Sequence, residues 1–300
     1  MPRVIDVADD TVASLPECID ALATAGFDPH DDGRVQHAAR LLRRLGNDPA
    51  FLGDLLVDEL AAMADEDDGA NSYGPQVIML HPPGIDDFFI RANIWPSPDE
   101  YTMRASGSAS FVYGLPHDHN FDFLTLGYFG PGYWSDYYEF DYESVAGWSG
   151  EPVDLRFVER ARLDQGKIML YRAHRDVHAQ HPADALSVSI NIMNASMAQG
   201  WMDQYAFDTD RRCISRIISS GSSEAFLRIA VGLGGAEALD LAHRFAAGHP
   251  SDRMRLCAWS ALASIAGDPA QRDDMWRKAE SSGSRLVAGE ARRHRHAIAA

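Results

Sequence analysis

The first part of the chain has apolar residues at the spacing of a helix. Within residues 10–64, they recur three and four positions apart, at Ala39, Leu41, Leu42, Leu45, Leu52, Leu55, Leu56 and Leu60. This spacing places apolar side chains on one face of a helix. Asp48 and Pro49 separate two such runs, as a cap and a first helical residue. The pattern predicts a helical N-terminal segment over residues 1–70, ending in the polar linker "ADEDDGANSYG".

The pattern changes to that of β-strands over residues 74–195. Short runs rich in β-branched and aromatic residues are separated by Gly, Pro, Asp and Ser: "QVIMLHPP", "DDFFIRANIW", "YTMRASGSASFVYG", "FDFLTLGYF", "VDLRFVERARL", "KIMLYRA" and "LSVSINIM". Runs of this kind with no helical pattern between them favour an all-β sandwich or barrel. We predict one β-domain over residues 71–200.

The last third of the chain returns to helical spacing. The segments "SSEAFLRIAVGL", "GAEALDLAHRFAAG", "SDRMRLCAWSALASIAG" and "DPAQRDDMWRKAESSG" each have the length of one helix, with capping residues near their ends. They predict a helical domain over residues 201–300. It is either a short HEAT-like stack or a packing appendage through which a homodimer forms. The predicted fold class is therefore α+β, with a central β-domain between two helical blocks.

Composition narrows the classes of partner. The 300 residues are 46% hydrophobic and carry a formal net charge of −17. This balance argues against nucleic acid and against an anionic membrane surface, because both require clustered Lys and Arg. The three cysteines form no CxxC pair, which is typical of a reducing compartment. No signal-peptide pattern or membrane-length apolar run is present, so the expected location is cytoplasmic.

Five histidines supply the candidate chemistry. His117 and His119 stand at the mouth of an apolar run in "GLPHDHNFDFLTLGYFGPG". Alternate residues of a strand face the same side, so the two imidazoles can hold one metal ion. A third ligand is expected from "DQGKIMLYRAHRDVHAQHPADALSVSINI". His178 begins the run that leads to the next strand, whereas His174 in the turn and His181 before a proline are weaker candidates.

These segments resemble the two motifs of the cupin superfamily. "GLPHDH" is similar to the first motif, and Gly166 to His178, followed by Asn191, is similar to the second without its Pro and inner Gly. The resemblance implies a double-stranded β-helix barrel with a metal in its mouth. Many cupins add a Glu after the histidine pair, which this sequence lacks. Asp122, three residues after His119, is a possible fourth ligand if a bulge turns it to the same face.

A cupin with three histidine ligands resembles the cysteine, or thiol, dioxygenase family, over about residues 75–195. Arg91 lies in "FFIRANIW", where that family has an arginine that grips the substrate carboxylate. Asn191 and Met193 stand where the family has a histidine and a tyrosine, and Leu124 stands near its crosslinked cysteine. The resemblance implies Fe(II), with Zn, Ni or Mn as alternatives. It also implies O₂ and a small amino-acid or thiol-like substrate.

An aromatic and acidic segment follows the predicted histidine strand. Residues 128–150, "YFGPGYWSDYYEFDYESVAGWSG", suggest either a hairpin that covers the barrel edge or a lid whose acids favour a cationic substrate group. Three of its tyrosines are candidate proton donors beside the site, and Tyr128 is the predicted catalytic one; the others are Tyr133 and Tyr138.

The functional prediction is a mononuclear non-haem iron cupin oxygenase. An oxoglutarate-dependent hydroxylase is a close rival, although its HxD pattern is absent because His119 occupies the second position. A non-oxidative metallocupin, acting as an isomerase or lyase, is the second hypothesis. The third is a non-enzymatic protein that binds metal and whose helical blocks dock a partner.

Overall fold

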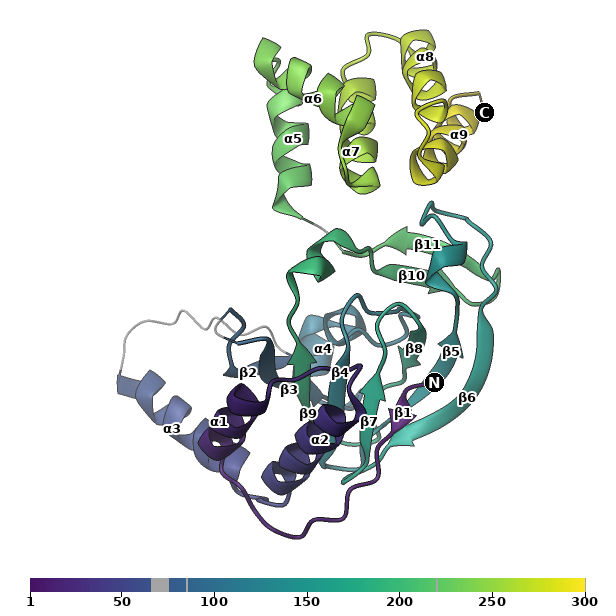
Figure 1. The fold of residues 1–300 in the computed structure, drawn as a ribbon. Coiled ribbons are helices and arrows are strands. Elements are labelled where there is room, and N and C mark those ends of the chain that lie inside the picture. Colours follow the sequence, from purple (N-terminus) through teal and green to yellow (C-terminus); the bar gives the residue numbers. More distant parts are fainter. Residues whose placement is uncertain (66–75, 85, 220, 300) are drawn as a thin grey trace. The chain divides into compact units, whose positions relative to one another are not determined.

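A computed structural model describes residues 1–65, 76–84, 86–219 and 221–299 (Figure 1). The chain divides into two compact units, and each is described by itself. The first combines Met1–Phe140 with Arg156–Gly200, and the second combines Asp141–Leu155 with Trp201–Ala300. Within the described residues, no helix combines the length and apolar character that spanning a membrane requires.

The first unit is built on a six-stranded antiparallel sheet. Its strand order is β1-β7-β4-β9-β3-β2. The strands are β1 (Arg3–Val4), β2 (Val77–His81), β3 (Phe88–Trp95), β4 (Phe123–Phe129), β7 (Ile168–Tyr171) and β9 (Ser187–Asn194). Register places Arg91, Asn191, Thr125 and Met169 side by side across four neighbouring strands. Residues in one such row face the same side of the sheet, so these four share a face.

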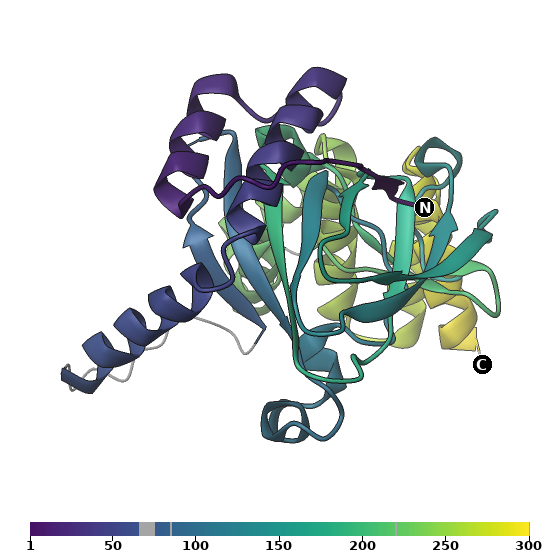
Figure 2. The same cartoon turned by 90° about the horizontal axis from the view of Figure 1, so that it is seen from below.

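Three N-terminal helices accompany this sheet: α1 (Leu15–Ala25), α2 (Asp32–Gly46) and α3 (Phe51–Asp65). Figure 2 shows α1 and α2 on one face of the sheet. Buried side chains such as Leu42 and Leu45 pack there with Leu124 and Ile190 in one apolar core. A Cβ on Gly46 would lie 2.3 Å from the Leu126 side chain, so this glycine permits the close approach of helix and strand. The predicted N-terminal helices are confirmed, and they form a layer of the first unit.

The other face of the large sheet meets a three-stranded sheet of order β6-β5-β8. Its strands are β5 (Tyr133–Glu139), β6 (Arg156–Leu163) and β8 (Asp176–Gln180). Side chains of the two sheets share one cluster, formed among others by Phe123, Met169, Tyr171, Met193, Tyr133 and Tyr137. The unit is a mixed helix and sheet structure whose sheets pack face to face. Because the described strands pair as separate sheets, a closed barrel is not shown.

One predicted strand is wrong. "YTMRASGSASFVYG" forms the helix α4 (Tyr101–Ser106) and the 3₁₀ turn η1 (Ser108–Phe111). Met103 is the only buried residue of α4, so this segment lacks the alternating buried face that a strand requires. Gly107, with φ of +77°, ends the helix in a conformation that glycine adopts without strain.

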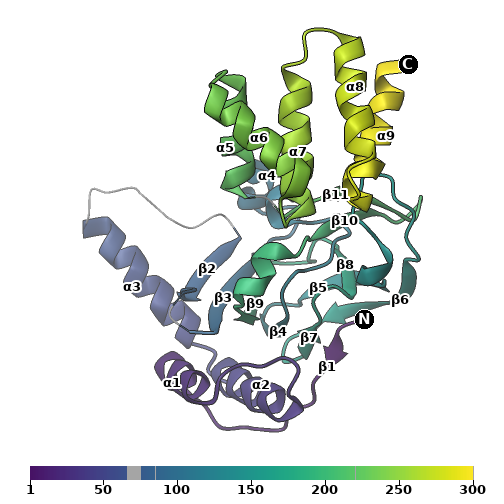
Figure 3. The same ribbon diagram turned by 45° about the horizontal axis from the view of Figure 1, so that its top comes forward.

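The described residues of the second unit form a hairpin and five helices. They are β10 (Tyr205–Asp208), β11 (Cys213–Ile217), α5 (Ser222–Gly232), α6 (Ala236–Gly248), α7 (Asp252–Ser264), α8 (Pro269–Glu280) and α9 (Arg285–Ala299). The second unit also contains the 3₁₀ turn η2 (Tyr142–Ser144), whereas η3 (Met197–Trp201) lies at the boundary in the sequence between the two units. Figure 3 shows α8 beside α9 and α6 beside α7, and both pairs are in contact. The C-terminal helices are thus confirmed, while the HEAT-like repeat stays a prediction.

Candidate metal centre

His117 and His178 come together because the segment before β4 pairs with β8. Residues 117 and 178 form an antiparallel bridge in which each backbone N–H donates to the other's carbonyl at 3.0 Å. The pairing continues on both sides, where Gly114 donates to Gln180 and His174 to His119. On the opposite edge of β8, Tyr137 of β5 lies across from His178. The third imidazole is therefore held from both sides by neighbouring strands.

Three imidazoles converge on one point. The ligand nitrogens of His117, His119 and His178 all lie within 4.8 Å of one another. The ring centroids are 4.9 Å apart for His117 and His119, 4.7 Å for His117 and His178, and 5.0 Å for His119 and His178. All three residues are buried, with at most 8% of their surface exposed. This cluster could bind a metal ion, and it is the set of histidines that the sequence predicted.

One outer hydrogen bond orients the ring of His117 toward the shared centre. The Nδ1 of His117 lies 2.8 Å from the carbonyl oxygen of Leu115, which requires a proton on Nδ1 and leaves Nε2 free to bind a metal. The Nε2 atoms of His119 and His178 are 3.0 Å apart. Their Nδ1 atoms are buried without a hydrogen-bond partner among the described residues. Only His117 thus has the outer hydrogen bond that commonly holds a metal-binding histidine.

Burial keeps the imidazoles in the form that binds metal. It lowers the pKa of His117 to about 4. The pKa values of His119 and His178 are held well below their usual value, first by burial and then by the positive charges of neighbouring histidines. Neutral imidazole is the ligand form, so near pH 7 no proton has to leave before a metal binds.

Aromatic rings enclose the cluster. Phe123 stacks on Tyr171 with centroids 4.5 Å apart and 7° between the planes. The centroid of His119 lies 5.0 Å from that of Phe123, and that of His178 lies 4.9 Å from that of Tyr171. The hydroxyl groups of Tyr137 and Tyr171 are hydrogen-bonded at 3.0 Å. Burial raises the pKa of Tyr137 to about 12, so its hydroxyl group keeps its proton near neutral pH.

Arg91 brings a positive charge to the face of the large sheet that meets the three-stranded sheet. Its Nε atom is buried without a hydrogen-bond partner among the described residues, and burial lowers the pKa of its guanidinium. Burial and the neighbouring histidines lower the pKa of His119, and the Arg91 charge adds to that effect. Burial raises the pKa of Tyr133, and the same charge partly opposes that rise. The predicted arginine therefore lies between the sheets, within electrostatic reach of the histidines. A buried cation without an acidic partner is costly unless an anion binds beside it.

Asp122 is not in the three-histidine group. Its Oδ1 accepts a hydrogen bond from the backbone N–H of Ala173 at 3.0 Å, and burial raises its pKa. The carboxylate thus holds the turn between β7 and β8, which carries His174. We therefore leave Asp122 out of the ligand set that follows.

The prediction of Tyr128 as a catalytic residue is corrected by its position. Its side chain belongs to the apolar core that β4 shares with the N-terminal helices. Its hydroxyl donates to the carbonyl oxygen of Asp48 at 2.8 Å, and its ring meets Phe51 edge to face. Alternation along β4 explains this, because Phe123 faces the histidines and Tyr128, an odd number of residues later, faces the opposite side.

Within the aromatic segment, β5 forms a wall of the site, and the two acids of this strand have structural partners. The strand pairs with both β6 and β8. Asp136 accepts two hydrogen bonds from Arg160 and lies 3.0 Å from His181. Glu139 pairs with Arg172. These pairings do not support acids that face a cationic substrate group.

Sequence reasoning missed Tyr137, Tyr171 and Gln180. Gln180 is buried, and its amide nitrogen is placed 3.2 Å from the Nε2 of His178. A signal for Gln180 was present, because it follows His178 by two residues and so shares its face of β8. The two tyrosines are brought to the histidines by strand pairing, which a local pattern does not specify.

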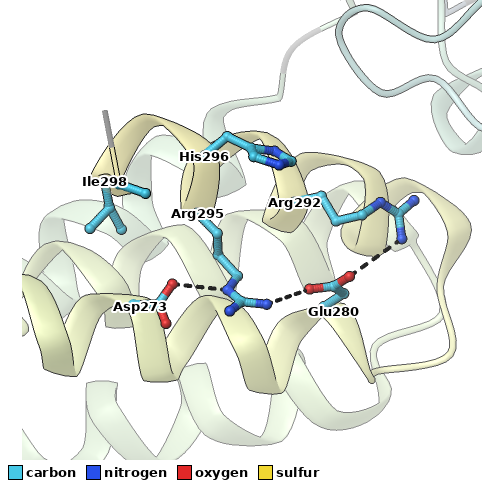
Figure 4. A pocket seen from close by; sticks show the side chains of 7 residues that line it. Asp273, Glu280, Arg292, Arg295, His296 and Ile298 are labelled. Atoms are coloured by element: carbon cyan, nitrogen blue, oxygen red, sulfur yellow. Dashed lines mark hydrogen bonds and ion pairs between the residues drawn. The ribbon is translucent and has the colours of Figure 1, made fainter.

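A separate groove of about 520 Å³ lies in the second unit, between α8 and α9 (Figure 4). Arg295 bridges Asp273 and Glu280 there, and Arg292 lies 3.7 Å from the second oxygen of Glu280. Because these two arginines already have carboxylate partners, neither is free to bind an anionic ligand.

Comparisons with known proteins are sparse. No family model matches this chain, and no curated protein matches it. Among solved structures, it is similar to vicilin from Corylus avellana (hazelnut), with 13% identity and a TM-score of 0.21. That match covers 50% of this chain and 41% of the other. A likeness of this size carries no argument about the fold or activity of this protein.

Proposed function

We propose that this protein is a mononuclear metalloenzyme of the cupin type, in which His117, His119 and His178 hold Fe(II). The observation that carries the proposal is the buried convergence of three neutral imidazoles. We further propose that the two facing sheets correspond to the double-stranded β-helix of cupins. The reaction we assign is an oxygenation of a small amino-acid or thiol-like substrate by O₂.

The donor set fits an open catalytic site. Three protein ligands leave coordination positions for substrate, whereas structural metal sites are usually closed by four. Imidazole nitrogen suits Fe(II), and also Zn, Ni or Mn, so the ligand set does not by itself select one metal. The reaction that the loaded protein carries out must distinguish them. When bound, Fe(II) would supply the redox chemistry that couples O₂ to the substrate.

Arg91 supports an anionic substrate. Its half-buried guanidinium has a buried Nε and lacks an acidic partner among the described residues. It lies on the face of the large sheet that meets the three-stranded sheet, where its charge reaches His119. A carboxylate can accept two hydrogen bonds from the planar guanidinium, which both binds and orients it. We infer that Arg91 binds the substrate carboxylate and thereby fixes the reactive end toward the histidines.

The surrounding residues exclude water and hold protons. Phe123 and Tyr171 pack against the imidazoles, so the site has an apolar wall on the side of the large sheet. Tyr137 and Tyr171 keep their hydroxyl protons, because burial raises both pKa values above the usual one for tyrosine. These hydroxyls can donate hydrogen bonds to a bound anion without releasing a proton.

The proposal is tested by metal analysis combined with O₂ uptake. Protein loaded anaerobically with Fe(II) is mixed with a panel of small α-amino acids, thiol carboxylates and aminothiols. O₂ consumption is followed with an electrode, and products formed under ¹⁸O₂ are weighed by mass spectrometry. We expect one Fe(II) per chain and a product that carries labelled oxygen. The variant His117→Ala/His119→Ala should lack both.

Other outcomes identify the alternative functions. Uptake that requires oxoglutarate would indicate a hydroxylase of that class. Turnover without O₂ in protein loaded with Zn, Ni or Mn would indicate an isomerase or lyase. Equal metal content in the wild-type protein and the double-histidine variant would disprove the assigned metal centre, and with it the proposed function.

A further inference from the structure

We propose that Gln180 supplies a fourth, oxygen ligand to the metal, so that the site is three imidazoles and one amide oxygen. This inference rests on the proposed metal centre and adds to it a residue that the sequence analysis did not single out. No carboxylate of the described residues joins the histidine group. Gln180 is the side chain whose polar end reaches that group instead.

The backbone directs Gln180 to the histidines. It follows His178 on β8 by two residues, so both side chains face the same side of the strand. The backbone carbonyl oxygen of Gln180 accepts a hydrogen bond from the backbone N–H of Gly114. This bond belongs to the same pairing of segments that positions His117. Gln180 is only 4% exposed, so its amide lies among the other groups of the site and not in solvent.

The spacing of the polar atoms matches that of ligands around one ion. Two ligands that are each about 2.1 Å from a metal lie about 3.0 to 3.4 Å apart in octahedral or tetrahedral geometry. The Nε2 atoms of His119 and His178 are 3.0 Å apart, and the amide of Gln180 is 3.2 Å from the Nε2 of His178. Gln180 therefore stands at the distance from His178 that a co-ligand has.

The amide itself lacks a full set of partners. Its Oε1 is buried with no hydrogen-bond partner among the described residues, while its nitrogen faces an imidazole nitrogen. The oxygen and nitrogen of a glutamine amide are assigned from their surroundings, because exchanging them leaves the shape unchanged. An exchange places the oxygen against His178, where it can bind a cation. An NH₂ group cannot serve there as a ligand.

A neutral oxygen ligand has a consequence for the chemistry. Three imidazoles and an amide add no charge to the centre, so a divalent ion keeps its full positive charge. A glutamate in the same place would cancel part of it. With Arg91 on the facing sheet, the site then favours an anionic substrate. Gln180 would thus help set both the metal affinity and the charge of the molecule that binds.

The test measures metal affinity rather than turnover. Metal-free protein is titrated with Co(II) against a competing chelator, for the wild type, Gln180→Leu, Gln180→Glu and the matched control Gln165→Leu. Gln165 is exposed, donates to the backbone carbonyl oxygen of Tyr128 and has no contact with the histidine group among the described hydrogen bonds. We expect Gln180→Leu to weaken Co(II) binding by about tenfold or more and Gln180→Glu to tighten it, with a change in the visible Co(II) spectrum in both. The control should match the wild type.

The outcomes separate this inference from the proposed function. If wild-type protein binds Co(II) but both Gln180 variants match it in affinity and spectrum, Gln180 is not a ligand and the three-histidine centre still stands. If wild-type protein binds no Co(II), the metal centre itself fails. Should Gln180→Leu not fold, as judged by circular dichroism, Gln180→Glu decides alone, since it preserves the shape of the side chain: tighter binding supports the ligand, and unchanged binding overturns it.

Discussion

His117 and His178 face each other across an antiparallel bridge and exchange two backbone hydrogen bonds of 3.0 Å each. Their ring centroids are 4.7 Å apart. This pairing brings together two histidines that are distant in the sequence, because both side chains leave the bridge on the same side. The other features of the site are arranged around that relationship.

Removing any of the three histidines should remove the metal. We expect His117→Ala, His119→Ala and His178→Ala each to lower Co(II) affinity by about 100-fold or more, because two remaining imidazoles seldom hold a divalent ion. Affinity is measured by competition with a chelator. His181→Ala is the matched control, since His181 pairs with Asp136 and is outside the group. Equal losses in His181→Ala would contradict the assignment.

Metal-free protein should lose stability as the pH falls from about 6.5 toward 4. His117 has a pKa of about 4 in the folded protein and 6.5 as its usual value, so in this window the unfolded chain binds more protons. Stability is therefore full above pH 6.5 and declines below it, by about 3 kcal/mol from His117 alone. Urea unfolding at several pH values measures the slope.

The matched variant for this slope is His117→Gln, which keeps a polar side chain that cannot be protonated here. Its stability should depend less steeply on pH between 6.5 and 5. In this range few carboxylates titrate, so the comparison isolates histidines. A slope equal to that of the wild type would show that His117 is not buried in neutral form.

Replacing Arg91 should stabilise the protein and weaken substrate binding. Arg91→Met removes a half-buried cation that has no acidic partner among the described residues, and methionine fills a similar space. We expect the free energy of unfolding to rise by about 1–2 kcal/mol, measured without substrate by urea titration. Arg160→Met is the control, because Arg160 is exposed and paired with Asp136, so solvent screens the pair and its loss should change stability little. A large loss of stability in Arg91→Met would indicate a structural role instead.

Gly132 should tolerate no side chain. It has φ of +75°, and a Cβ there would lie 1.9 Å from the carbonyl oxygen of Leu163. Gly132→Ala should therefore cost about 3 kcal/mol or more, from backbone strain together with a clash. Gly107 has φ of +77° but nothing within 4 Å, so Gly107→Ala measures strain alone and should cost about 1 kcal/mol. Similar melting temperatures for both variants would show that the strands separate to accommodate the methyl group.

Local sequence patterns predicted most of the helices and strands, but not every strand that lines the histidine site. The strands over "DDFFIRANIW", "FDFLTLGYF" and "LSVSINIM" are confirmed, because each carries alternating faces that bury different side chains. The segment that forms β5 was predicted only as part of a covering hairpin or a lid, because it is rich in tyrosines and acids. In the structure, Tyr133 and Tyr137 face inward while Trp134 is exposed, so the strand alternates after all.

The sequence by itself determined that His117 and His119 point to one side, because the two-residue period of an extended chain is a local property. It also indicated His178 as their partner. Only the tertiary structure decided that Tyr137, Tyr171 and Gln180 border the imidazoles, and that Tyr128 faces the helices. These placements depend on which strands pair and in which register, and a one-residue shift in register would exchange every inward side chain for an outward one.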